Sequence, residues 1–572
     1  MKIRPSVGIL LLMATGLLTA CSSTPQRHDS NNGRLLEKPG DVDFGSVQAN
    51  MMYEILVGEI ATQRGQPDVA AHFYLEAAKK SHDPEIAART ARIASFAKED
   101  TVALEAARIW VENDPGNLEA TRMLTVFYIR TGKIEDTKKL VMTLLEASEE
   151  RISRTILHIG AMLQREASEK SAVEISAFVS ERYPQYAETH YVHASLLLGV
   201  NEKEQALAAV EKALKIKQDW IDAITLRARV LIQLSRSEEA LTYLAKYLKS
   251  HPSEDGVRLT YARALVDVRR LEEARSQFEL LAVKMPDNED VLFTLAMLSM
   301  QFKQLDEADG YLRQLYKMGK SSSQVMYYLG QIAEQKENDS DALNWYNRIS
   351  SGEYYLDSQL RIASVLARSN SLNEALEHIR ALEIKTLEEK KEILIFEGNL
   401  LKNAGQFKDA YNLYSRGLDE FRNDIDLLYS RALVAEKLDR IDVTIEDLQF
   451  VLQREPDNAA AHNALGYTLA DRTNRLEEAL QHIKRAMELE PEDPAVIDSL
   501  GWVYFRLGQH DKAVELLRQA YTMIRDGEVA AHLGEALFVS GQTSEARQVW
   551  DEAREQFGDN EVLLQTMKRF GH

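Results

Sequence analysis

The chain has 572 residues, of which 45% are hydrophobic and 28% are charged, a composition typical of soluble globular proteins. This composition excludes a multispanning membrane protein, a collagen and a disulfide-stapled miniprotein. Lys and Arg total 69 against 89 Asp and Glu, so the formal net charge is −20. Because this excess of negative charge repels phosphate backbones and anionic lipid surfaces, we expect no nucleic-acid partner.

The first 20 residues have the pattern of a secretory signal peptide that ends at a cysteine. Lys2 and Arg4 are basic, residues 7–18 are apolar but too few to span a membrane, and Leu18-Thr19-Ala20-Cys21 follows. This tetrapeptide resembles the lipobox of bacterial lipoproteins, in which the cysteine is acylated after cleavage. The alternative is an ordinary signal peptide with an incidental cysteine. We predict a lipoprotein signal peptide over 1–20 and lipidation at Cys21.

The cellular location follows from the same segment. Cys21 is the only cysteine, so its lipidation would leave no disulfide, cysteine nucleophile or cysteine metal ligand. In the lipoproteins that this start resembles, Asp after the cysteine retains the protein in the inner membrane, and here the residue is Ser22. The resemblance implies a lipid anchor in the outer membrane, facing the periplasm. Residues 21–50 lack an apolar period and predict a lipidated cysteine and a flexible tether.

From residue 51 onward the chain repeats with a period of 33 to 35 residues. One series of small residues is Ala70, Ala103, Thr137, Ala172, Ala206, Ala240, Ala274, Ala308, Ala342, Ala375, Ala410, Thr444, Ala479, Ala513 and Ala546. A second series lies twelve residues before each of these, or thirteen before Ala479, and begins at Gly58. Gly lies five residues before the marker in five units, and Pro lies twelve residues after it in six.

This spacing predicts a repeated helical hairpin. Gly ends the first helix in a left-handed conformation, Pro blocks continuation of the second, and the small residues let the helices approach closely. The pattern resembles the tetratricopeptide repeat, and the best unit runs from Asp498-Ser499-Leu500-Gly501-Trp502 to Ala520. We therefore predict an all-α fold, a tetratricopeptide-repeat superhelical solenoid of up to about fifteen hairpins over 51–560. A capping helix is predicted over 561–572, and an irregular stretch suggests a division near residue 350.

No catalytic constellation emerges from the sequence. Gly319-Lys320-Ser321 ends like a phosphate-binding loop, but Gln314 stands where the first glycine is needed. His190 and His193 are three residues apart on a predicted helix, yet no second pair follows to complete a metal site. We expect no enzyme activity, no catalytic residues, no cofactor and no metal.

The binding surface must then come from the first helices of the repeats, which line a groove in such a solenoid. On the resemblance, exposed groove positions of the carboxy-terminal units are Asn463, Tyr467, Asp498, Trp502 and Arg506. Trp, Tyr and Arg are frequent anchors of protein interfaces. The alternative is that Tyr467 and Trp502 only complete the packing between repeats.

The lipobox, the short tether and the long array together resemble proteobacterial outer-membrane tetratricopeptide lipoproteins. The size of the chain and the segments Asn463–Arg472 and Asp498–Trp502 resemble, more closely, the pseudomonad lipoproteins that partner a periplasmic carboxyl-terminal processing protease. The resemblance implies an adaptor that binds this protease and its substrates, such as peptidoglycan hydrolases. Two alternatives remain open: an assembly lipoprotein for an outer-membrane secretion, pilus or polysaccharide machine, and an enzyme or enzyme activator acting on the cell wall.

Overall fold

The computed structural model describes residues 45–148, 151–320, 322–369, 371–558 and 560–572. The predicted signal peptide, Cys21 and most of the predicted tether lie outside these residues. Residues 47–50, which were predicted to belong to the tether, are instead helical, because Ser46 caps the first helix by accepting a hydrogen bond from the amide of Ala49. The array therefore begins four residues earlier than the repeat period predicts.

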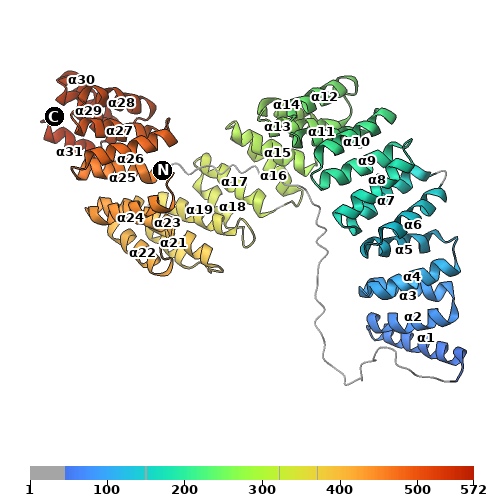
Figure 1. The fold of residues 1–572 in the computed structure, drawn as a ribbon. Coiled ribbons are helices and arrows are strands. Elements are labelled where there is room, and N and C mark those ends of the chain that lie inside the picture. The colour runs from blue at the N-terminus through green and yellow to red at the C-terminus, as the bar shows by residue number, and fades with distance from the viewer. Residues whose placement is uncertain (1–44, 149–150, 321, 370, 559) are drawn as a thin grey trace. The chain divides into compact units, whose positions relative to one another are not determined.

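The described residues form helices and no strand, which confirms the all-α solenoid (Figure 1). Their thirty-one helices match in number fifteen hairpins and one further helix at the carboxy terminus. The chain divides into two compact units, one ending at Ala274 and the other beginning at Arg275.

The helices of the first unit are α1 (Val47–Gln63), α2 (Pro67–Ser81), α3 (Pro84–Ala97), α4 (Asp100–Asn113), α5 (Leu118–Arg130), α6 (Ile134–Glu146), α7 (Ile152–Glu166), α8 (Glu169–Arg182), α9 (Ala187–Gly199), α10 (Lys203–Ile216), α11 (Ile221–Gln233), α12 (Ser237–Ser250) and α13 (Asp255–Asp267). Helix α14 (Leu271–Lys284) contains the boundary. The helices of the second unit are α15 (Glu289–Gln301), α16 (Leu305–Lys317), α17 (Ser323–Gln335), α18 (Asp339–Tyr346), α19 (Tyr355–Arg368), α20 (Leu372–Arg380), α21 (Leu387–Asn403), α22 (Phe407–Glu420), α23 (Ile425–Lys437), α24 (Ile441–Arg454), α25 (Ala459–Arg472), α26 (Leu476–Leu489), α27 (Pro494–Arg506), α28 (His510–Met523), α29 (Gly527–Val539), α30 (Thr543–Gln556) and α31 (Glu561–Arg569).

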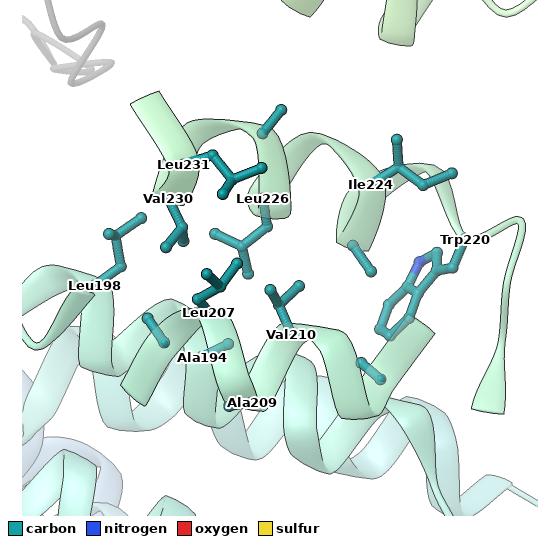
Figure 2. Packing of buried hydrophobic residues seen from close by; sticks show 14 of the residues in the cluster. Ala194, Leu198, Leu207, Ala209, Val210, Trp220, Ile224, Leu226, Val230 and Leu231 are labelled. Carbon is teal, nitrogen blue, oxygen red and sulfur yellow. The ribbon is translucent and has the colours of Figure 1, made fainter. Parts of the chain in front are cut away.

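The small residues of the second helices lie in the core, as their periodicity predicts. All fifteen members of the series that begins at Ala70 are exposed by at most 3%. Figure 2 shows the packing in one stretch of the first unit, where Ala194 and Ala209 lie among Leu207, Val210 and Leu226. Small side chains bring neighbouring helices together, and the larger aliphatic ones fill the layer between them.

Where the first-helix small residue is glycine, an aromatic ring often occupies the space that a Cβ would need. A Cβ on Gly330 would lie 2.3 Å from the ring of Tyr346, and the same distance separates a Cβ on Gly398 from Tyr414. Each ring lies sixteen residues after its glycine and is fully buried. Glycine and ring are therefore complementary parts of one hairpin.

The turns inside the hairpins use the left-handed conformation. The five turn glycines identified from the sequence, Gly65, Gly132, Gly405, Gly508 and Gly541, have φ between 69° and 84°. Other hairpins place Lys98, Lys303 or Asp439 in the same conformation, with φ of 57° to 61°. Glycine adopts this conformation without a Cβ penalty, which explains its recurrence in the turns.

The predicted division near residue 350 does not coincide with the boundary between the compact units, which lies in α14. The irregular stretch after α18 remains packed because Ile349 is buried and the ring of Tyr327 lies 5.9 Å from Tyr346 and 5.1 Å from Tyr354. At the carboxy terminus α31 packs against α29 and α30 through buried Leu563 and Met567, within the range predicted for the capping helix.

Candidate protein-binding surface

The five residues predicted to bind a partner lie on two neighbouring first helices of the second unit. Asn463 and Tyr467 are on α25, and Asp498, Trp502 and Arg506 are on α27. Within each helix these residues are four positions apart, so they lie on one face. Helix α27 packs against both α25 and α29, and the three helices form one continuous surface.

Asp498 lies beneath this surface and pairs with a histidine of the next repeat. Its carboxylate is 3.0 Å from Nδ1 of His532 on α29, and both residues are buried. Burial alone would lower the pKa of His532, but Asp498, Glu528 and Asp471 raise it above its usual value. The structure therefore favours an imidazolium held by a carboxylate inside the repeat stack.

Trp502 packs between repeats and is only 6% exposed. Its ring stacks on the His532 ring at 4.3 Å between centroids, and its Nε1 donates a hydrogen bond to Asp471 Oδ1 at 3.2 Å. The prediction that Asp498 and Trp502 are exposed is wrong, because the first helix of the following repeat covers both side chains. Trp502 makes the inter-repeat contacts that the alternative interpretation describes.

Tyr467 links helices that are two repeats apart. Its hydroxyl donates a hydrogen bond to Glu528 Oε1 at 3.0 Å, and its ring centroid lies 6.0 Å from that of His532. Burial and the nearby carboxylates, Glu528 first, raise the pKa of Tyr467 well above its usual value, so the hydroxyl remains a donor. Tyr467 is half-buried.

Asn463 and Arg506 retain polar atoms at the edge of this cluster. Arg506 is half-buried and donates one hydrogen bond, from Nη1 to the backbone oxygen of Asp471 at 2.8 Å. Asn463 Oδ1 is covered from solvent but accepts no hydrogen bond from the described residues. A buried acceptor without a donor is costly, so this oxygen is a locally unfavourable feature of the cluster.

Three further members of the cluster were missed from the sequence: Asp471, Glu528 and His532. A signal was available, because Asp471 continues the four-residue spacing of Asn463 and Tyr467, and His532 lies 34 residues, one repeat period, after Asp498. We name Asn463, Tyr467, Asp471, Arg506 and Glu528 the polar face, and Asp498, Trp502 and His532 its support.

The other sequence candidates do not form sites in the structure. Gly319 has a φ of 77° after α16, Lys320 pairs with Glu289, and Ser321 lies outside the described residues. His193 Nδ1 lies 2.9 Å from Ser176 Oγ, and His190 Nδ1 lies 3.5 Å from Ser180 Oγ, so the two imidazoles do not converge. No set of three possible metal ligands occurs among the residues that the structure describes.

Comparison with known proteins agrees with the repeat pattern. The family model "Tetratricopeptide repeat" matches residues 429–494, a second of that description matches 496–526, and "Psidin, N-terminal TPR repeats region" matches 197–344. A TPR repeat-containing protein of Pseudomonas aeruginosa, PA4667, is 33% identical over 532 residues, which cover 92% of this chain and 90% of the relative. The chain belongs to the tetratricopeptide-repeat family.

Solved structures of tetratricopeptide-repeat proteins also match, at low structural similarity. A thermophilic TPR protein of Thermus thermophilus is 25% identical, covering 31% of this chain and 97% of its own, with a TM-score of 0.29. A chain of the APC/C hetero-tetramer Cut9–Hcn1 is 14% identical, and the match covers 85% of this chain and 96% of that chain with a TM-score of 0.34. The helical hairpins and the Pseudomonas relative establish the fold.

Membership of the tetratricopeptide-repeat family implies a protein-interaction scaffold, and this fold is typical of non-catalytic proteins. Among the helices of the described residues none is long and apolar enough to cross a membrane. Protein partners are thus the expected ligands of this repeat scaffold.

Proposed function

We propose that this protein is a lipid-anchored adaptor of the outer membrane, which binds a periplasmic carboxyl-terminal processing protease and its peptidoglycan-hydrolase substrates and promotes their degradation. The lipobox-like start at Cys21 and the likeness to a pseudomonad repeat protein over 92% of the chain support this proposal. The anchor keeps the array at the membrane, and the array supplies the binding surfaces.

The observation that carries the proposal is the polar face on α25, α27 and α29. Its side chains are fixed by contacts between repeats: Tyr467 is held by Glu528, and Arg506 by the backbone oxygen of Asp471. Ordering these long side chains before binding lowers the entropy that a partner must offset.

Two compact units suit a protein with two kinds of partner. Each unit carries its own hydrophobic core and its own row of first helices. We propose that the protease and its substrates bind separate stretches of the array, so that one molecule holds both.

The test is capture of partners from envelope extract by the chain without residues 1–21, followed by mass spectrometry. Recovery of a processing protease together with cell-wall hydrolases would support the adaptor. Recovery of channel, pilus or secretion components without a protease would contradict it and favour the assembly lipoprotein.

A matched pair of variants tests the polar face itself. Arg506→Gln removes a charge on first helix α27, whereas Arg547→Gln removes the same charge from an exposed position on second helix α30. We expect Arg506→Gln to reduce recovery of one partner and Arg547→Gln to leave recovery unchanged. Equal recovery with both variants would exclude Arg506 from the binding surface.

A further inference from the structure

Two histidines of one hairpin bring their Nδ1 atoms together. His462 on α25 and His482 on α26 lie with these nitrogens 2.9 Å apart and with ring centroids separated by 5.1 Å. Both side chains are half-buried, so the pair can be reached from solvent. The two residues are twenty positions apart, which hides the pair from any search for histidines closely spaced in sequence.

The tautomer of His462 is fixed by the backbone. Its Nε2 lies 3.0 Å from the carbonyl oxygen of Pro456, and because a carbonyl can only accept, Nε2 carries the hydrogen. In the neutral ring Nδ1 then carries a lone pair directed at His482. An imidazole that donates its other N–H to a carbonyl has the arrangement found in metal-ligating histidines.

The second ring is partly buried beside one ion pair. Burial lowers the pKa of His482, and the neighbouring His462 lowers it further, as does Arg475. Glu478 acts in the opposite direction, but its carboxylate is held by Arg475 through contacts of 2.6 and 2.8 Å.

We propose that His462 and His482 form a two-histidine site for a divalent transition metal, with Cu²⁺ or Ni²⁺ as the preferred ion. Metal–nitrogen bonds of about 2.05 Å to nitrogens 2.9 Å apart subtend an angle of about 90° at the metal. Such a cis angle suits the square-planar or tetragonal geometry of Cu²⁺ and Ni²⁺.

Metal binding requires a change of tautomer at His482. In the free protein the proton on His482 Nδ1 is donated to His462 Nδ1. When the metal binds, that proton moves to His482 Nε2 through solvent, and both Nδ1 atoms turn their lone pairs to the ion. No three-ligand set occurs among the described residues, so water completes the coordination. The site is independent of the adaptor function proposed above.

The first unit offers a matched control. His190 lies six residues after Pro184, as His462 lies six residues after Pro456, and its Nε2 is likewise 3.0 Å from the proline carbonyl. Its Nδ1, however, faces the hydroxyl of Ser180 instead of a second imidazole. His190 thus shares the backbone contact and lacks the second ligand.

The test is to titrate the full chain with CuCl₂ and with NiCl₂ at pH 7.5. Calorimetry measures the binding of each metal, and electron paramagnetic resonance reports the ligands of the bound copper. We expect His462→Gln and His482→Gln each to weaken one binding event more than about tenfold, and His190→Gln to leave it unchanged. The copper spectrum should show nitrogen coupling that both variants lose. Affinity and spectra unchanged in both variants would overturn the proposal.

A measurement on the unsubstituted protein guards against misfolded variants. In air, ascorbate reduces the bound copper, the reduced copper reduces dioxygen, and the oxidants formed there oxidise the side chains that hold the ion. Peptide mapping then locates the oxidised histidines. Oxidation concentrated at His462 and His482 is expected, and oxidation spread over the other histidines would overturn the site.

Discussion

The close fit between Gly534 and Trp550 provides a direct test of the hairpin packing. A Cβ on Gly534 of α29 would lie 2.0 Å from Nε1 of Trp550 on α30, whereas few real Cβ contacts are shorter than 3.4 Å. The ring would have to move by about 1.4 Å, the difference between these distances. The Trp550 ring has no room to do so, because Trp550 is fully buried and the Phe570 ring stacks on it with 5.7 Å between the two ring centroids.

The magnitude follows from two opposing terms. Overpacking of a well-packed core costs about 1–3 kcal/mol, and a shift of this size at a fully buried ring belongs at the upper end. Alanine gains about 1 kcal/mol over glycine inside a helix. Gly534→Ala should therefore lower the free energy of unfolding by about 2 kcal/mol.

Gly310→Ala is the control. Gly310 lies inside α16 of the same compact unit and is exposed, and a Cβ added there would meet no atom within 4 Å. Only the helix-propensity term applies, so this variant should gain up to about 1 kcal/mol. Urea unfolding followed by tryptophan fluorescence measures both changes. Midpoints that shift in the same direction would refute the claim that Gly534 is required for close approach of the ring.

Three further predictions concern the turns and the buried charges. Gly508→Ala should cost about 1 kcal/mol in urea unfolding, because φ is 74° there and no neighbouring atom obstructs the methyl; a neutral result would contradict the conformational argument. Arg431→Met should cost about 3 kcal/mol by the same measurement, because Arg431 makes two contacts of 2.7 and 2.8 Å to the buried carboxylate of Asp447, which would then be unpaired. The raised pKa of His532 in the folded state stabilises the protein fully below the unfolded pKa of about 6.5, and this contribution is lost as the pH rises through the folded value. His532→Gln should therefore lose more stability at pH 5.5 than at pH 9, and a pH-independent loss would argue against an imidazolium paired with Asp498.

Periodicity predicted the fold well because the strongest signal in a repeat protein is local and recurs. The small residues at Ala70 and its counterparts and the turn glycines each act within one hairpin, and sequence spacing reports them directly. The start of the array was less accurate, because a single cap at Ser46 extends α1 into the predicted tether.

Side-chain exposure in the candidate site was harder to predict. Trp502 and Asp498 occupy positions that face the groove in the repeat pattern, yet His532 of the next repeat covers them. This covering depends on the identity of one residue 34 positions away, which the small-residue pattern does not include. The His462–His482 pair was missed for the same reason, since it joins two helices through side chains outside that pattern.

Reconstituted proteolysis tests the adaptor proposal most directly. A purified periplasmic carboxyl-terminal processing protease is mixed with a purified peptidoglycan hydrolase, with and without this protein, and loss of the intact hydrolase is followed in time. The proposal predicts faster degradation when the protein is present, and a smaller acceleration with Arg506→Gln than with Arg547→Gln. An unchanged rate of degradation, with no binding of the protein to either the protease or the hydrolase, would contradict the adaptor function.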